Sequence, residues 1–484
     1  MRKSLGMAVL VIVLCVGLGM TGFVRLNESG KQIQYEETVL FGDKTAIEGL
    51  SVMHQLGAPT GSGYLYWDTA YRPAEGTSET DYVYREKKLE TPVENKEYLN
   101  IRAYSGGGIH TTGSIDLEKE GGEWAPLLLD VAERAGEELS YSEIVDLKDY
   151  FEYYPMSISV NIGTLQIYSD SGMWNSDVEQ WMKILQNEFR IPIPEESSNV
   201  KVEMLKRADG SVYAYSISPV EWIPYCLSYS LVTEKCCYVL VQRREKDADS
   251  SRVKEYWAIY HIPYETVTDT GRREKTVLHM EEMEKIAFAD SGIGRHEFRY
   301  DEKRNRIEII YMEYCGEEFS PCKLMVLDGK TGETVQEMTL IDREDVSISK
   351  VYCHDDFMVI TMRDVRQDGR RGFVLLNREE NGNYQIAFEG DLPEKEVTDD
   401  EIWIENRIPQ YAVSMDFDGE RLVMGAVVDG YLGGSKKPGL FQIIVYEAGE
   451  LIFHGQYQSS LVIGEDIDDG WQHLKWTPLT VSWD

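Results

Sequence analysis

The stretch "RIEIIYMEYCGEEFSPCKLMVLDGKTGETVQEMTL", residues 306–340, decides the fold class. Its apolar residues alternate with polar ones in successive runs, which is the period of a β-strand with one buried face. A polar loop separates the first two runs, and the glycine-containing turn around Gly329 separates the second from the third. The stretch therefore predicts three consecutive antiparallel strands.

The same pattern of strand, loop, strand, turn and strand occurs three more times after residue 200, with second strands that begin near Tyr256, Phe373 and Phe441. Repeated antiparallel units of about 40–50 residues are typical of β-propellers, whose blades pack face to face. We therefore predict a mainly β fold, with an irregular β-propeller-like domain of repeated antiparallel blades over residues 201–484. An array of β-sandwiches is the alternative. The last apolar run, residues 475–483, is expected to pair the last blade with the first.

Residues 26–200 are predicted to form an α+β part of the ectodomain, as early blades with helical insertions. Three segments have helical start and stop signals. They are "APLLLDVAERAGEEL" (125–139), "YSEIVDLKDYFEYYP" (141–155) and "SDVEQWMKILQNEFR" (176–190).

The chain has 84 acidic and 49 basic residues, a formal net charge of −35. Affinity for nucleic acids comes from Lys and Arg side chains that neutralise phosphates, so this surface repels such partners. We therefore expect no nucleic-acid ligand.

Residues 5–24, "LGMAVLVIVLCVGLGMTGFV", form an uncharged apolar run long enough to cross a bilayer as a helix. Arg2 and Lys3 precede it, which favours an N-terminus inside the cell and an extracytoplasmic remainder. We predict a single-pass anchor in the cell membrane, comprising residues 1–25. A cleaved signal peptide is the alternative.

Six cysteines follow the apolar run, too few in about 460 residues for a disulfide scaffold. Cys315 and Cys322 flank the loop "GEEFSP" between two predicted strands, which could place their Cβ atoms opposite each other. We predict one disulfide, between this pair.

Gly329, Lys330 and Thr331 match the last three letters of a phosphate-binding loop. That motif needs a first glycine at position 324 and a following helix, whereas Leu324 and a strand-like run occupy these places. We expect a hairpin turn and no nucleotide. No cofactor and no metal site are predicted either, because "CHDD" (353–356) fits a turn and "EDIDDGW" (465–471) departs from the calcium-loop spacing.

An aromatic cluster is the one candidate ligand site, formed by Tyr64, Tyr66, Trp67, Asp68 and Tyr71. Aromatic faces stack on sugar rings, and a carboxylate accepts hydrogen bonds from hydroxyl groups. The alternative is that these alternating aromatics form the core of one blade, and we favour that alternative.

The segment "VLFGDKTAIEGLSVMHQL", residues 39–56, followed by "YLYWDT" at 64–69, resembles single-pass, membrane-anchored ectodomain proteins of Gram-positive anaerobes that have no assigned function. The resemblance covers about the first 75 residues. It implies the same inside-to-outside topology and no particular site residue.

These features favour a non-enzymatic binding module for an envelope protein or a cell-wall component, since no coherent set of catalytic residues is recognisable. The alternative is a glycan-directed hydrolase or glycan-binding protein with carboxylates in a propeller channel, because glycoside hydrolysis needs only two suitably spaced carboxylates.

Overall fold

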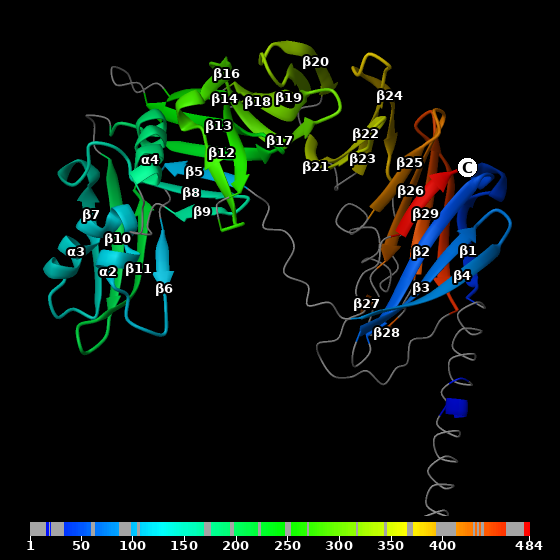
Figure 1. Cartoon of the computed structure of the whole chain (residues 1–484), viewed down its shortest axis with the longest axis horizontal. Helices are drawn as coiled ribbons and strands as arrows, with labels where there is room; N and C mark the ends of the chain where they lie inside the picture. The colour runs from blue at the N-terminus through cyan, green and yellow to red at the C-terminus, as the bar shows by residue number, and fades with distance from the viewer. Residues whose placement is uncertain are drawn as a thin grey trace, which may run out of the picture. The chain divides into compact units, whose positions relative to one another are not determined.

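The structure is a computed structural model that describes most of the chain outside its N-terminal segment and several loops (Figure 1). The described residues are 16–18, 20, 33–59, 63–86, 98–103, 107–168, 176–193, 198–220, 224–246, 253–268, 271–315, 318–342, 346–364, 371–393, 413–428, 431–432, 435–436, 440–460 and 479–484.

The chain is mostly β and divides into two compact units. Unit 1 combines residues 1–91 with residues 345–484, and unit 2 comprises residues 92–344. The predicted boundary near residue 200 is not found, because that residue lies inside a strand paired on both edges. Repeat patterns along the sequence do not reveal that the two ends of a chain belong to one unit.

Unit 1 contains three antiparallel sheets. The first has the order β31 (Leu479–Trp483), β2 (Leu50–Pro59), β3 (Gly63–Arg72) and β4 (Thr77–Glu86). The second has the order β1 (Tyr35–Gly42), β30 (Glu450–Ser459), β29 (Leu440–Glu447), β26 (Arg421–Val428) and β25 (Val413–Phe417). The third has the order β21 (Val346–Cys353), β22 (Phe357–Asp364), β23 (Arg371–Arg378) and β24 (Tyr384–Asp391). A short pair, β27 (Tyr431–Leu432) with β28 (Ser435–Lys436), and the 3₁₀ turn η1 (Lys44–Ile47) complete the described elements of this unit.

The second sheet of unit 1 is buried on both faces. Phe441 and Ile443 of β29 pack with Val52 of β2 in one core, whereas Ile444 packs with Phe373 of β23 in another. A strand that is buried on both sides reads as a nearly continuous apolar run, as "FQIIVY" in β29 does apart from the buried Gln442. The three sheets therefore stack face to face, like successive blades.

Both chain ends close unit 1. The C-terminal β31 pairs with β2 of the first sheet, and the N-terminal β1 pairs with β30 of the second. The expectation that residues 475–483 supply a closing strand is confirmed for residues 479–483. Each end adds an edge strand to a sheet made from a distant part of the chain.

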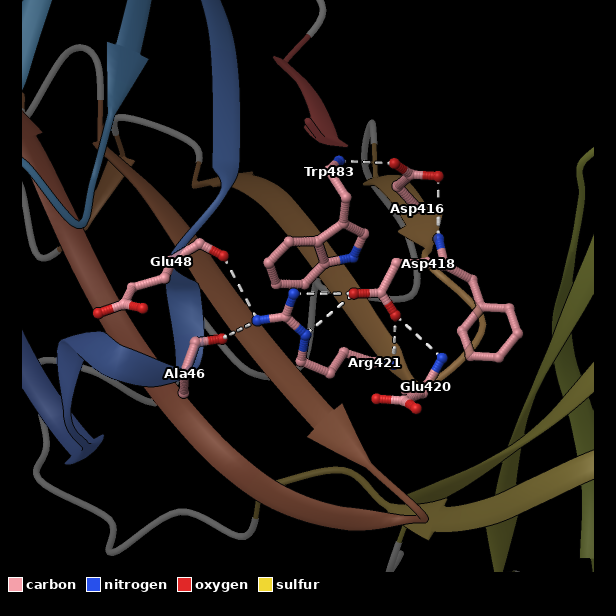
Figure 2. A network of polar contacts seen from close by, with 8 residues as sticks. Ala46, Glu48, Asp416, Asp418, Glu420, Arg421 and Trp483 are labelled. Atoms are coloured by element: carbon pink, nitrogen blue, oxygen red, sulfur yellow. Dashed lines mark hydrogen bonds and ion pairs between the residues drawn. The ribbon is translucent and has the colours of Figure 1, made fainter.

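A network of polar contacts locks β31 in place (Figure 2). The Trp483 backbone N–H donates to the Asp416 carboxylate at 2.7 Å. The Arg421 guanidinium lies 3.9 Å from the centre of a Trp483 ring, and its Nε donates to Asp418 at 2.9 Å. Its Nη1 donates to the carbonyl oxygens of Ala46 (3.3 Å) and Glu48 (3.4 Å). One side chain thus joins β26, β31 and η1.

Unit 2 contains a four-stranded meander of β17 (Gly292–Asp301), β18 (Arg306–Cys315), β19 (Glu318–Asp328) and β20 (Thr334–Ile341). A larger sheet has the order β15 (Glu274–Leu278), β14 (Val253–Thr268), β13 (Cys236–Lys246), β12 (Tyr225–Val232), β5 (Tyr98–Ala103), β8 (Met156–Ile162) and β9 (Leu165–Tyr168), and β16 (Glu284–Ala289) also pairs with β14. A third sheet has the order β6 (Gly108–His110), β11 (Val212–Pro219), β10 (Asn199–Lys206) and β7 (Ser140–Asp146).

The helical elements described in unit 2 are α2 (Leu117–Glu120), α3 (Ala125–Arg134), α4 (Ser176–Phe189), and the 3₁₀ turns η2 (Gly122–Trp124), η3 (Leu147–Asp149) and η4 (Met280–Glu282). Two of the three predicted helices are confirmed: the one expected at 125–139 is present over residues 125–134, and the one expected at 176–190 over residues 176–189. The third, at 141–155, is wrong, because β7 and η3 occupy it. Its capping signal was overridden by pairing with β10, which takes up the backbone hydrogen bonds of the segment.

The large sheet of unit 2 is also covered on both faces. Leu240 and Ile259 pack with Ile309 of the meander, whereas Val241 and Ala258 belong to a core that includes Leu185 and Phe189 of α4. Helix α4 therefore lies over the face of β13 and β14 opposite the meander.

The four predicted repeats coincide with strand triplets. They are β13–β14–β15, β18–β19–β20, β22–β23–β24 and β26–β29–β30, and every middle strand pairs with both neighbours. The mainly β, antiparallel architecture is thus confirmed, whereas a closed propeller is not found among the described residues.

Within the described part of the chain, no helix has both the length and the apolar character to span a membrane. The predicted anchor at residues 5–24 lies almost wholly outside the described residues, so it stays a prediction.

Replacing Arg421 with Ala should lower the free energy of unfolding by about 2–3 kcal/mol, because hydrogen bonds to a charged group and a cation–π contact are lost together. Chemical denaturation followed by tryptophan fluorescence measures this change. Arg363→Ala, at an exposed position of β22, is the matched control and should change stability by less than about 0.5 kcal/mol. Equal effects from the two variants would contradict the assigned role of Arg421.

Candidate functional site

A pocket of about 610 Å³ lies in unit 2, between the C-terminal end of α4 and the face of β13, β14 and β16. Its lining combines aromatic, small and ionisable side chains from these elements. They are Glu188, Phe189, Val241, Arg243, Lys254, Glu255, Tyr256, Ala258, Tyr260, Lys285, Phe288 and Asp290. The volume is in the range of small-molecule sites.

The floor of the pocket follows from strand register. Val241, Ala258 and Phe288 lie side by side on neighbouring strands, as do Arg243 and Tyr256. Side chains two residues apart on β14 share one face, so Ala258 lies between Tyr256 and Tyr260. The small alanine between two large aromatics leaves the hollow.

Aromatic rings form much of the wall. The ring centres of Tyr256 and Phe288 are 5.7 Å apart, and those of Phe189 and Tyr260 are 5.0 Å apart with an edge-to-face geometry. Phe288 is 49% exposed although it is a large apolar side chain. An open aromatic face of this kind can stack on a flat ligand group.

Several ionisable groups of the pocket are held by neighbours. The Arg243 Nη2 lies 2.7 Å from a Glu245 carboxylate oxygen, and the Arg244 Nε lies 2.8 Å from a Glu255 oxygen. The Tyr260 hydroxyl donates to Glu188 at 2.9 Å. These contacts hold the side chains in place before a ligand arrives.

Burial shifts the pKa values of two tyrosines of the pocket. Burial raises the pKa of Tyr256 to about 12. Burial also raises the pKa of Tyr260, and the hydrogen bond to the Glu188 carboxylate raises it further. Both hydroxyls therefore stay protonated at neutral pH and can donate hydrogen bonds.

A glycine makes room for Glu255. A Cβ atom at Gly292 would lie 1.9 Å from the Glu255 Oε2, so no larger residue fits there without moving the carboxylate. The first residue of β17 thus helps to set the position of an acid at the pocket.

The aromatic cluster predicted from sequence does not form one site. Trp67 and Tyr71 point to the same side of β3 and are 7% and 3% exposed, and Tyr71 is part of the core between two sheets. Tyr66 and Asp68 lie on the other face, where Asp68 accepts a hydrogen bond from Gln55. Alternation along a strand separates the set. The side chain of Tyr64 lies outside the described residues.

The predicted Cys315–Cys322 disulfide is not formed. The register places Met312 opposite Cys322 and Glu318 opposite Cys315, and Cys322 is a buried free thiol. The loop is shorter than the sequence pattern indicated, because Glu318 to Pro321 continue the strand β19.

The turn at Gly329 is confirmed as a β19–β20 connection. The Asp328 carboxylate accepts hydrogen bonds from the backbone N–H groups of Lys330 (2.9 Å) and Thr331 (2.8 Å), so it occupies donors that a phosphate would need. Gly332 has a φ of +68°, and a Cβ there would lie 1.9 Å from the Ile286 carbonyl oxygen. The turn therefore packs against β16, next to the pocket.

One group of potential metal ligands was not predicted from the sequence. Ligand atoms of His279, Glu281 and Glu282, around η4, all lie within 4.8 Å of one another. The two acids are exposed and no spacing motif marks the group, so the geometry by itself assigns no ion.

"CHDD" at 353–356 ends β21 and turns into β22, as predicted, with the His354 N–H donating to the Phe357 carbonyl at 2.8 Å. The segment 465–471 lies outside the described residues.

Sequence reasoning also missed the pocket. Its residues come from one helix, three strands and the bend after β16, and Glu188 and Asp290 are about 100 positions apart. The available signal was Ala258 between Tyr256 and Tyr260, since a small residue between large ones on a strand face leaves space. Nothing in the sequence indicated that α4 covers this face.

No protein-family model matches the chain, and no curated protein matches it. Among solved structures, a proposed 6-phosphogluconolactonase of Bacteroides fragilis is similar over 84% of this chain and 93% of its own, with 8% identity and a TM-score of 0.25. A subtype N10 neuraminidase-like protein of A/little yellow-shouldered bat/Guatemala covers 56% and 90%, with 12% identity and a TM-score of 0.21. The WD40 domain of SCAP from fission yeast covers 68% and 90%, with 10% identity and a TM-score of 0.18. Such low scores carry no argument about this chain.

Two histidines are buried in unit 1. His54 and His454 are 2% and 5% exposed, and the Tyr35 hydroxyl lies 3.0 Å from the His54 Nδ1. Burial lowers the pKa of each to about 4. Both rings are therefore neutral in the folded protein at neutral pH.

Unit 1 should lose stability as the pH falls from about 6.5 to 4. In that window the two histidines bind protons in the unfolded chain and stay neutral in the folded protein. The fall in pH therefore lowers the free energy of unfolding by about 1–3 kcal/mol for each histidine. Urea denaturation across the pH range measures the loss. His54→Gln and His454→Gln should each flatten the dependence, whereas exposed His110→Gln should leave it unchanged.

Replacing Gly332 with Ala should lower the free energy of unfolding by about 2–4 kcal/mol, because the new Cβ meets the Ile286 backbone and the positive φ strains a non-glycine residue. Thermal or urea unfolding measures this. Gly271→Ala, which has open space around it, is the control. Stabilisation of the wild type by ATP would contradict the assignment of this turn as purely structural.

Proposed function

We propose that this chain is a non-catalytic binding module of the cell envelope, exported and anchored by residues 5–24, whose ligand binds in the pocket beneath α4. The observation that carries the proposal is the pocket itself, with an exposed aromatic face beside ionisable groups in a hollow of about 610 Å³. Such a hollow suits a small polar ligand or the end of a wall polymer.

The contacts favour binding over hydrolysis. A glycosidase needs one carboxyl group as an acid and a second as a base or nucleophile. Glu255 is paired with the Arg244 guanidinium, and Glu188 accepts the Tyr260 hydroxyl proton as a hydrogen bond. Both carboxylates are therefore already engaged by neighbouring side chains. The glycan-directed hydrolase therefore remains the second candidate.

We also propose that the repeated sheets form an irregular, propeller-like ectodomain. The face-to-face stacking of the three sheets in unit 1, and the closing strands supplied by both chain ends, support this proposal. Propeller blades are commonly joined in this way, with one blade built from both ends of the chain.

Calorimetry with soluble disaccharide–peptide fragments, made by muramidase digestion of purified Gram-positive wall, tests the binding function. We expect saturable binding to the wild type. Phe288→Ala, which removes the exposed stacking face, and Ala258→Leu, which fills the floor, should each weaken binding about tenfold or more. Val335→Ala, at a 39% exposed apolar position of β20, is the matched control and should bind like the wild type.

Equal binding by the wild type and Phe288→Ala, or no binding at all, would refute this function. The same mixtures also separate binding from hydrolysis. New reducing ends that appear with the wild type and not with Phe288→Ala would establish the hydrolase instead.

A further inference from the structure

Two ionisable side chains of the pocket differ from the others because they lack an ion-pair partner within the described part of the chain. The Lys285 ammonium lies 5.1 Å from the centre of the Phe288 ring and has no carboxylate partner there. Asp290 has neither a hydrogen bond nor an ion pair among the described residues. By contrast, Arg243, Glu255 and Glu188 are held by neighbouring groups.

A β-bulge brings Lys285 to the pocket. In β16, Phe288 pairs with Ala258, Ala287 with Ile259 and Lys285 with Tyr260, so Ile286 is the extra residue. Without the bulge, Lys285 and Phe288 would face opposite sides of the sheet. Ile286 packs instead into the core on the far face, and its backbone is contacted by the β19–β20 turn at Gly332.

The cation and the anion lie at opposite ends of the exposed aromatic face. Lys285 lies in β16, which ends at Ala289, and Asp290 follows in the bend directly after that strand. Five residues of extended chain span about 13–16 Å once the bulge is allowed for, and this is the upper bound on the separation along the backbone. Phe288 lies between them and is half exposed. Lys285, Phe288 and Asp290 therefore form a row that presents a positive charge, an apolar surface and a negative charge, one after the other.

We propose that the pocket binds an extended zwitterionic peptide of about four residues. Its carboxylate pairs with Lys285, its ammonium pairs with Asp290, and an apolar side chain packs on Phe288. An extended chain of four residues spans about 13–14 Å, which matches the row. This inference rests on the proposed function, since it names the ligand class of the same pocket.

The charge balance disfavours other ligand classes. The pocket has three basic and three acidic side chains in a protein of net charge −35, so neither a polyanion nor a polycation is favoured. A neutral sugar would remove water from Lys285 and Asp290 without pairing with either, which costs binding free energy. A ligand with one charge of each sign satisfies both.

The test uses the peptide Ala-Phe-Ala-Ala in four forms: free, N-acetylated, C-amidated and doubly capped. Calorimetry with the full chain at low salt should show that each single cap weakens binding about tenfold or more. Lys285→Gln should abolish the difference between the free and the C-amidated peptide and keep the N-acetyl effect. Asp290→Asn should abolish the N-acetyl effect and keep the amide effect.

Lys275→Gln and Glu274→Gln, at exposed positions of β15 outside the pocket lining, are the matched controls and should keep both cap effects. Cap effects that survive in the Lys285 and Asp290 variants would overturn the inference. So would a neutral N-acetylglucosamine trimer that binds as tightly as the free peptide.

The outcomes also separate this inference from the proposed function. Binding of the trimer or of wall fragments that Phe288→Ala weakens would keep the pocket as the ligand site and reject the zwitterionic class. Binding of none of these probes to the wild type would reject both. The peptide ligand could come from two sources, free peptide or peptide of the cell wall. Competition of intact wall fragments with Ala-Phe-Ala-Ala would identify the wall as the source, and no competition would identify free peptide.

Discussion

The burial of β-sheets on both faces is the constraint on which the rest of this structure depends. A sheet that packs a core on each side needs a neighbour on each side, and the second sheet of unit 1 has both. The two chain ends help to build these sheets, because the C-terminal strand β31 pairs with β2 of the first sheet and the N-terminal strand β1 pairs with β30 of the second. Arg421 and Asp416 hold the C-terminal strand in place, because they connect β31 to strands that are remote in sequence.

In unit 2 the same constraint produces the pocket. The large sheet packs against the meander on one face and against α4 on the other, and the pocket lies at the C-terminal end of that helix. Ala258 leaves space there, the bulge at Ile286 turns Lys285 toward it, and the turn at Gly332 packs behind the bulge. The segment that resembled a nucleotide loop thus contributes to the pocket as a support, through backbone contact and not through phosphate chemistry.

Much of the fold was predictable because alternation and turn residues act locally. The strand triplets, the helices at 125–139 and 176–190 and the turn at Gly329 follow from near neighbours in sequence. The helix expected at 141–155 failed because pairing between β7 and β10 outweighs a capping signal. The disulfide expected between Cys315 and Cys322 failed because register depends on where a strand begins, which a single segment does not specify. Among the aromatic residues of β3, Trp67 and Tyr71 are buried and Tyr71 is part of a core, which agrees with the favoured interpretation that these alternating aromatics form the core of a blade.

The sequence by itself determined the antiparallel strand repeats, the strongly negative net charge and the structural nature of the glycine turn, since each depends on local spacing or on total charge. Only the tertiary structure decided that the chain ends join one unit and that Glu188, Tyr256, Phe288 and Asp290 surround one hollow. These results depend on which sheet faces pack together. That choice is made by the complementary fit of whole surfaces, which no local pattern encodes.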